Sequence, residues 1–210
     1  MLMTTQPKPI SSQGIRIGTL LCLLLAILVC NGCLTRPALR RENFAFQNPP
    51  PPQTPPTSGI IIAVNSVDVS PLFDKNSFTY RTGPVSYESD PYAGFMVPPD
   101  QAIAIAMRAH LVASRKFRNV IEPGGMMNGS QSVEAYVSEL YGDFSQPGKG
   151  VAVLSMRISV YDPRFGHSPI MQKDYSERVP VQKNTAADVM AGWNTALDQI
   201  MTEFNSDLPR

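Results

Sequence analysis

The chain has 210 residues, enough for one domain of ordinary size together with a short additional segment. Its 18 Lys and Arg residues nearly balance its 17 Asp and Glu residues, so the formal net charge is +1. A charge this close to zero produces no strong electrostatic field. The composition therefore does not predict a nucleic acid or an acidic polymer as partner.

The first segment has the features of an export signal. An unbroken apolar run extends from Leu20 to Cys30 and follows two basic residues. A membrane-spanning helix needs about 20 apolar residues, so this run is too short to span but suits a secretory signal. Asn31 and Gly32 follow the run and directly precede Cys33. This arrangement resembles the lipobox of bacterial lipoproteins. Gly32 then closes a signal peptide of residues 1–32, and Cys33 receives lipid. The alternative is an ordinary signal or short anchor helix with an incidental cysteine.

The cysteine count agrees with lipidation. Cys22 and Cys30 would leave with the signal peptide, so the mature chain keeps Cys33 alone and has no internal disulfide or thiolate metal cluster. Removal of Lys8 and Arg16 lowers the Lys plus Arg count from 18 to 16, which against 17 acidic residues gives a net charge of about −1 by the same rule.

A lipidated Cys33 predicts attachment to a membrane. Acyl chains contribute ~0.8 kcal/mol per buried CH₂, so several chains hold a protein far more firmly than one. The residue after the cysteine is Leu34 rather than aspartate. By resemblance to lipoproteins of enteric-type bacteria, this implies the periplasmic face of the outer membrane.

Residues 33–58 are expected to form a disordered tether. The segment contains seven prolines and few large apolar residues apart from Phe44 and Phe46. Such a composition cannot bury enough surface to fold, and consecutive prolines favour polyproline II. At ~3.1 Å per residue the segment would reach on the order of 75 Å when fully extended. The folded domain is accordingly expected to cover residues 59–210.

The sequence of the first half of this domain predicts strands followed by a helix. Ile60 to Val69 is rich in β-branched residues and ends before a proline, which predicts a strand. Phe78 to Arg81 and Val85 to Glu88 flank a Thr-Gly-Pro turn, which predicts a hairpin. Pro98-Pro99 then introduces a helix over 100–114 with an apolar stripe.

The second half predicts three strands and a final helix. Val133 to Leu140 and Ile170 to Val179 are strand candidates on either side of Val151 to Tyr161, whose strict alternation indicates one packed and one solvated face. Ala186 to Asn205 carries an apolar stripe that includes Trp193, expected to anchor the core. The predicted fold class is α+β: an antiparallel or mixed sheet with two amphipathic helices packed on one face.

The order of these segments resembles a known family. A strand ending in FTYRTG, an aromatic and proline group (Phe95, Pro98, Pro99), a helix ending in RKFRNVI and a VEAYVSEL strand follow one another, before an alternating hairpin and a last amphipathic helix. This pattern, together with the amino-terminal cysteine, resembles the ABC-type transport auxiliary lipoproteins, the PqiC-like family that accompanies MCE-type lipid transport systems. Phe95 stands where the family usually has tryptophan.

The resemblance implies a function without catalysis. It implies an auxiliary or scaffold component between inner and outer membrane, with an MCE-domain protein and its ABC permease and ATPase as partners and self-association into a ring. Tyr80, Arg81, Tyr87 and Phe95 are the candidate partner-contact residues, since aromatic and Arg side chains often dominate interfaces. The alternative for these four residues is core packing and a structural ion pair.

The motifs of common enzymes are missing from the sequence. It contains no phosphate-binding P-loop, dinucleotide motif or G-x-S-x-G nucleophile elbow. The histidines are His110, on the first predicted helix, and His167, in a turn; Asp162 in that turn is expected to be solvated. No catalytic residue, cofactor or metal site is predicted. The alternative function is a lipid-anchored envelope hydrolase, which would require a histidine buried beside carboxylates in a cleft.

Overall fold

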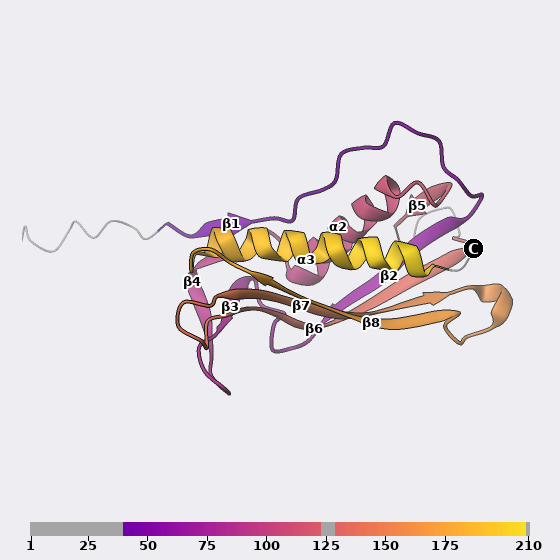
Figure 1. Cartoon of the computed structure of the whole chain (residues 1–210). Coiled ribbons are helices and arrows are strands. Elements are labelled where there is room, and N and C mark those ends of the chain that lie inside the picture. The colour runs from indigo at the N-terminus through magenta and orange to yellow at the C-terminus, as the bar shows by residue number, and fades with distance from the viewer. Residues whose placement is uncertain (1–39, 123–128, 209–210) are drawn as a thin grey trace, which may run out of the picture. The chain divides into compact units, whose positions relative to one another are not determined.

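The computed structural model describes residues 40–122 and 129–208, within a compact unit that begins at Arg40. Gly32 and Cys33 lie outside the described residues. The elements of the unit (Figure 1) are, in chain order, β1 (Glu42–Phe44), β2 (Ile61–Val69), β3 (Ser77–Arg81), β4 (Tyr87–Phe95), α2 (Pro99–Ala113), β5 (Asn119–Ile121), β6 (Gln131–Asp143), β7 (Val151–Tyr161), the short 3₁₀ helix η2 (Pro163–Phe165), β8 (Met171–Pro180) and α3 (Ala186–Asp207).

The strands form one mixed eight-stranded sheet, and β6 is its organising strand. One edge of β6 pairs antiparallel with β7 along its length. Its other edge pairs in parallel first with β2 and then, near its end, with β3. From there β3 leads to β4 and β1, β2 leads to β5, and β7 leads to β8. The sheet therefore branches around a single long strand.

Both helices lie on the same face of the sheet (Figure 1). α2 packs against β2 and β5, whereas α3 packs against β7 and β8. The predicted apolar stripe of α3 is buried throughout, at Val189, Met190, Trp193, Leu197, Ile200, Met201 and Phe204. The α+β prediction with two helices on one face is thus confirmed.

Local sequence explains how the helices begin. Pro99 occupies the first turn of α2, where its missing N–H costs no hydrogen bond. The Thr185 hydroxyl caps α3 by accepting a hydrogen bond from the backbone N–H of Asp188 at 3.2 Å. The Asp188 carboxylate, in the first turn, also complements the positive end of the helix dipole.

The fold begins earlier than expected. β1 (Glu42–Phe44) pairs in parallel with β4, and Phe46 is 9% exposed and stacks on Phe95 with ring centroids 6.1 Å apart. The prediction that residues 33–58 form a disordered tether is therefore wrong for 42–46, because two phenylalanines bury enough apolar surface to order the chain. The expectation for residues 33–39 lies outside the described residues.

The open face of the sheet is less solvated than the alternation in β7 predicts. Ser155 and Ser159 are 8% and 6% exposed. The Ser155 hydroxyl donates to Glu139 Oε2 at 2.6 Å, and Gln172 Nε2 donates to the Ser159 hydroxyl at 2.9 Å. Polar side chains of neighbouring strands thus cover these serines, while Arg157 between them remains about half exposed.

Asp162 is buried rather than solvated. Its carboxylate begins η2 and accepts hydrogen bonds from the Arg164 backbone N–H at 3.0 Å and from Arg164 Nη2 at 2.6 Å. The bonds from the Arg164 side chain are the largest cause of a pKa well below the ordinary aspartate value, and they outweigh the effect of burial. The expectation failed because a cap inside a turn is a local contact that composition does not reveal.

Candidate functional site

An ion-pair cluster on the open face of the sheet links β3, β6 and β8, and Arg178 of β8 reaches across the intervening strand β7. Arg81 donates to both carboxylate oxygens of Asp143, from Nε at 3.2 Å and from Nη2 at 2.6 Å. Arg178 Nη2 donates to Oδ2 of the same carboxylate at 2.9 Å. The Asp143 side chain is 8% exposed, whereas those of Arg81 and Arg178 are 27% and 48% exposed. Two cations therefore share one buried anion and reach the surface.

The electrostatics of this cluster favour the ionised carboxylate. Burial on its own raises the pKa of Asp143, but hydrogen bonds from Ser145 and Arg81 outweigh it and lower the pKa to about 2. Asp143 is consequently charged at any physiological pH and holds both guanidinium groups in place.

Aromatic rings pack beside the ion pairs. Phe73, from the turn after β2, stacks on Tyr141 at 5.5 Å and meets Tyr87 edge-on at 6.0 Å. Tyr87 is the register partner of Arg81, and the Arg81 guanidinium lies 5.6 Å from the Tyr141 ring centroid. The cluster is thus a rigid platform that leaves Tyr87 45% exposed.

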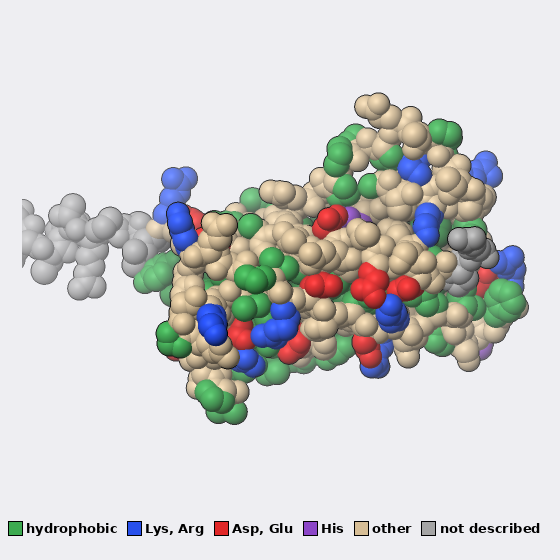
Figure 2. Space-filling model, viewed as in Figure 1, with side chains coloured by type: hydrophobic (Ala, Val, Ile, Leu, Met, Phe, Trp, Pro, Cys, Tyr) green, Lys and Arg blue, Asp and Glu red, His purple; other side chains and the backbone are tan. Residues whose placement is uncertain are grey.

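Two large apolar side chains extend this platform into solvent. Leu72 precedes Phe73 and is 73% exposed; Val85, in the β3–β4 turn, is 88% exposed. We name Leu72, Val85 and Tyr87 the hairpin surface. Apolar side chains are visible at the projecting tip at the lower left of Figure 2, where Figure 1 places the β3–β4 turn. Sequence reasoning missed Leu72 and Val85, and the available signal was an apolar residue directly after a proline.

The structure separates the four predicted contact residues. Arg81 and Tyr87 lie together on the open face. Tyr80 alternates to the other face, donates from its hydroxyl to Asp90 Oδ2 at 2.8 Å and contacts the Phe144 ring. Burial, followed by the hydrogen bond to Asp90, raises the Tyr80 pKa. Phe95 is 3% exposed. Packing accounts for the positions of Tyr80 and Phe95, so Arg81 and Tyr87 remain as surface candidates.

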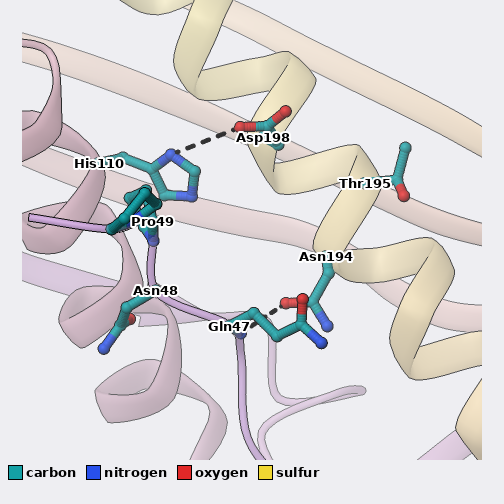
Figure 3. Close-up of a pocket in the computed structure, with 8 residues that line it drawn as sticks. Gln47, Asn48, Pro49, His110, Asn194, Thr195 and Asp198 are labelled. Atoms are coloured by element: carbon teal, nitrogen blue, oxygen red, sulfur yellow. Dashed lines mark hydrogen bonds and ion pairs between the residues drawn. The ribbon is translucent and has the colours of Figure 1, made fainter.

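A pocket of about 400 Å³ lies between the two helices and the chain that follows β1. Figure 3 shows α2, α3 and the segment after β1 each contributing side chains to it. The lining residues are Gln47, Asn48, Pro49, Pro50, His110, Asn194, Thr195 and Asp198. Gln47 donates its backbone N–H to Asn194 Oδ1 at 2.7 Å, and this bond fixes the segment against α3.

His110 is the titratable centre of this pocket. Its side chain is 12% exposed, and its Nδ1 lies 3.8 Å from Oδ1 of Asp198, beyond ordinary hydrogen-bond distance. Burial lowers the His110 pKa, and the charge of Asp198 partly opposes this. Burial therefore favours the neutral form of this imidazole. The Thr195 hydroxyl in the same pocket donates to the Ala191 carbonyl at 3.1 Å and so is not held by His110.

The remaining surface gives little sign of a charged ligand site. His167 is exposed in the β7–β8 connection. Acidic and basic side chains are intermixed over the face seen in Figure 2. Within residues 40–122 and 129–208 there is no group of His, Cys, Asp or Glu arranged to hold a metal ion. None of the helices in those ranges has both the length and the apolar character needed to cross a bilayer.

Comparison with known proteins identifies the fold. Protein XCC0632 from Xanthomonas campestris, described as a DUF330 protein, has 16% sequence identity and a TM-score of 0.62, covering 79% of this chain and 90% of its own. The structure of an uncharacterized protein has 15% identity and a TM-score of 0.63, covering 80% of this chain and 100% of its own. No sequence among the curated proteins matches the chain.

The sequence itself supplies the family. The family model of the ABC-type transport auxiliary lipoprotein component matches residues 44–204, which is most of the chain and nearly all of the described unit. The match starts at the last residue of β1, in agreement with the place of that strand in the sheet. The chain therefore belongs to the family of ABC-type transport auxiliary lipoprotein components.

Proposed function

We propose that this protein is a non-catalytic lipoprotein, anchored at the periplasmic face of the outer membrane through lipid on Cys33. It serves there as an auxiliary scaffold of an MCE-type ABC lipid transport system. The observation that carries the proposal is the family match over residues 44–204, which makes the chain an auxiliary component of ABC-type transport. The signal-like segment directly before Cys33 supports export and lipidation of that cysteine.

The hairpin surface is the proposed contact with the MCE-domain protein. Leu72, Val85 and Tyr87 expose apolar area on a base that the ion pairs of Asp143 and the ring of Phe73 hold rigid. Rigid, partly exposed aromatic residues lose little conformational entropy on binding, which is why they often dominate interface energies. The hairpin also projects from the sheet, so a partner can reach it without displacing either helix (Figure 1).

Co-purification of a tagged full-length chain after gentle solubilisation tests this proposal. We expect an MCE-domain protein in the eluate, together with its ABC permease and ATPase. Val85→Asp should reduce recovery of the MCE-domain protein at least about tenfold, because Val85 is 88% exposed on the hairpin surface and burying an unpaired charge in an interface costs more than about 1.4 kcal/mol. Tyr136→Asp is the matched control, since Tyr136 is 47% exposed on β6, away from the hairpin. Consistent failure of any MCE-domain protein to co-purify would refute the proposal.

The anchor has its own test. Cys33→Ala should release the protein from the membrane fraction or leave it unprocessed. Mass spectrometry of the native protein should find acyl mass on its amino terminus. A ring of several copies is also proposed. The mass of the solubilised protein, measured by light scattering, should therefore be several times the monomer mass.

The second candidate function is a lipid-anchored envelope hydrolase. The observation in its favour is the largely buried His110, with one carboxylate, Asp198, at 3.8 Å in a pocket. Against it, the hydroxyl in that pocket bonds to a backbone carbonyl instead of His110. A His110→Gln variant that complements a deletion strain fully would exclude this function, and loss of complementation with an unchanged melting temperature would support it.

A further inference from the structure

The start of the fold at β1 limits how far the domain can lie from its anchor. Eight residues, 34–41, separate Cys33 from Glu42, the first residue of the sheet. A fully extended chain spans at most ~3.6 Å per residue, so these residues reach no more than about 30 Å. The tether of about 25 residues expected from composition would have allowed more than twice that distance.

The edge of the sheet nearest that link has side chains suited to a lipid surface. Arg40 and Arg41 are exposed and directly precede β1. The register pairs Glu42 with Ala93 in parallel, which places Arg41 beside Tyr92, and Tyr92 is 48% exposed. We name Arg40, Arg41 and Tyr92 the anchor edge.

Its neighbours leave much of this edge free to interact. The Arg41 guanidinium lies over Gly94 and donates once, from Nη2 to the Ser77 hydroxyl at 3.1 Å, leaving further donors. The nearby carboxylate of Asp90 is already bonded to the Tyr80 hydroxyl and to the backbone N–H groups of Tyr92 and Ala93. Glu42 is the exposed acid on β1, so the edge keeps a small positive excess.

We propose that the anchor edge rests on the bilayer surface, with Arg40 and Arg41 at lipid phosphates and the Tyr92 ring at the headgroup level. This inference rests on the proposed lipidation of Cys33. Guanidinium groups match phosphate oxygens in a bidentate manner, and each basic residue near an anionic membrane contributes about 1 kcal/mol. Tyrosine places an apolar ring and a polar hydroxyl at such an interface. Contacts this weak suffice because the anchor makes them intramolecular.

The arrangement also predicts which part of the domain points away from the membrane. β6 has 13 residues and runs between the two ends of the domain. Its last residue pairs with β3, on the side of β4 and β1. Near its start, Ser132 pairs with Tyr161, which lies close to η2. At ~3.3 Å per residue these ends are about 40 Å apart. Phe165 in η2 is 69% exposed and marks the distant end.

Site-specific fluorescence quenching tests the orientation. Asn43→Cys on β1 and Phe165→Cys, each in the acylated full-length chain, place one free thiol at either end, because lipid occupies the sulfur of Cys33. Each variant is labelled with bimane and reconstituted into phosphatidylethanolamine–phosphatidylglycerol vesicles carrying a headgroup nitroxide quencher. We expect at least about threefold stronger quenching at residue 43 than at residue 165. Equal quenching at both positions would overturn the proposal.

Charge reversal tests the role of the arginines. Arg40→Glu with Arg41→Glu should lower quenching at residue 43, while Arg118→Glu with Arg157→Glu, two exposed arginines nearer the start of β6, should leave it unchanged. The same loss in both double variants would show that the anchor edge has no specific contact. Flotation separates this failure from that of the proposed function: protein that does not float with vesicles lacks the lipid anchor, which removes both proposals together.

Discussion

Arg81 and Asp143 are register partners at the point where β3 joins β6, and two side-chain hydrogen bonds reinforce that junction. The two strands pair over just Tyr80–Gly142 and Arg81–Asp143. The ion pair therefore helps to hold the β1–β4–β3 part of the sheet against the β6–β7–β8 part.

Asp143→Asn should destabilise the domain. The neutral amide leaves two guanidinium groups without their shared anion, and lost hydrogen bonds to charged groups cost about 1.5–3 kcal/mol. Urea unfolding at neutral pH measures this loss. Asp174→Asn is the control, because its pair with Arg157 has a 69% exposed carboxylate and should contribute less than about 1 kcal/mol. Equal losses in the two variants would mean that the ion pair at the β3–β6 junction contributes no more to stability than an exposed pair.

The same carboxylate predicts a pH dependence. The pKa of Asp143 is about 2 in the folded protein, below its ordinary value of 3.8, so the unfolded chain binds the proton more tightly. The contribution of Asp143 to the free energy of unfolding is therefore complete above about pH 4 and is lost as the pH falls towards 2. The stability difference between the native protein and Asp143→Asn should shrink over that range. A difference that stays constant would contradict the lowered pKa.

Trp193→Ala should cost ~3–5 kcal/mol, the range for large-to-small changes in a core. Trp193 is fully buried, packs edge-on against Phe78 at 4.8 Å and donates its Nε1–H to the Val153 carbonyl at 3.1 Å. The denaturant midpoint measures the effect. Thr195→Ala, on the exposed side of the same helix, should change stability by less than about 0.5 kcal/mol. An unchanged midpoint for Trp193→Ala would place this residue outside the core.

Phe46→Ala tests where the fold begins. Phe46 is 9% exposed and stacks on Phe95, so its removal should cost about 3 kcal/mol, the low end for phenylalanine, because it lies at the rim of the core. Phe165→Ala is the matched control, with a ring 69% exposed, and should be nearly neutral. If both variants are neutral, the stable domain begins later in the chain, near residue 59 as first expected.

Gly192→Ala should be destabilising although alanine favours helices. A Cβ at position 192 would lie 2.5 Å from the Cβ of Ala152, so α3 would have to move away from β7. Overpacking of this kind costs about 1–3 kcal/mol, more than the roughly 1 kcal/mol gained in helix propensity. Ala152→Gly in the same chain should recover part of the loss. Stabilisation by Gly192→Ala alone would refute this close approach.

The sequence predicted best the elements whose pattern is long and regular. The alternation over Val151 to Tyr161 and the helical stripe around Trp193 both extend over several repeats, and both elements lie where they were expected. Their burial on the helix-covered face followed from periodicity alone.

Other parts of the fold depend on contacts that periodicity does not contain. β1 has three residues beside a proline-rich run, and it is ordered because Phe44 and Phe46 meet aromatic partners distant in sequence. β4 continues beyond Glu88, the last residue of the predicted strand, through Pro91 to Phe95. Nothing local shows that β6 pairs in parallel with both β2 and β3. At the candidate site, the type of residue pointed to Arg81 and Tyr87, but only the fold shows that Phe95 faces inward.

The direction of β1 has a mechanical consequence for a protein fixed to a membrane by its amino terminus. Tension arriving through Arg40 would pull β1 along its own axis, since that strand runs parallel to β4 at the margin of the sheet. The backbone hydrogen bonds between β1 and β4 would bear such a force together, instead of breaking one after another. The ring of Phe46 is buried just beyond the strand, so withdrawal of β1 would also require this ring to leave the core.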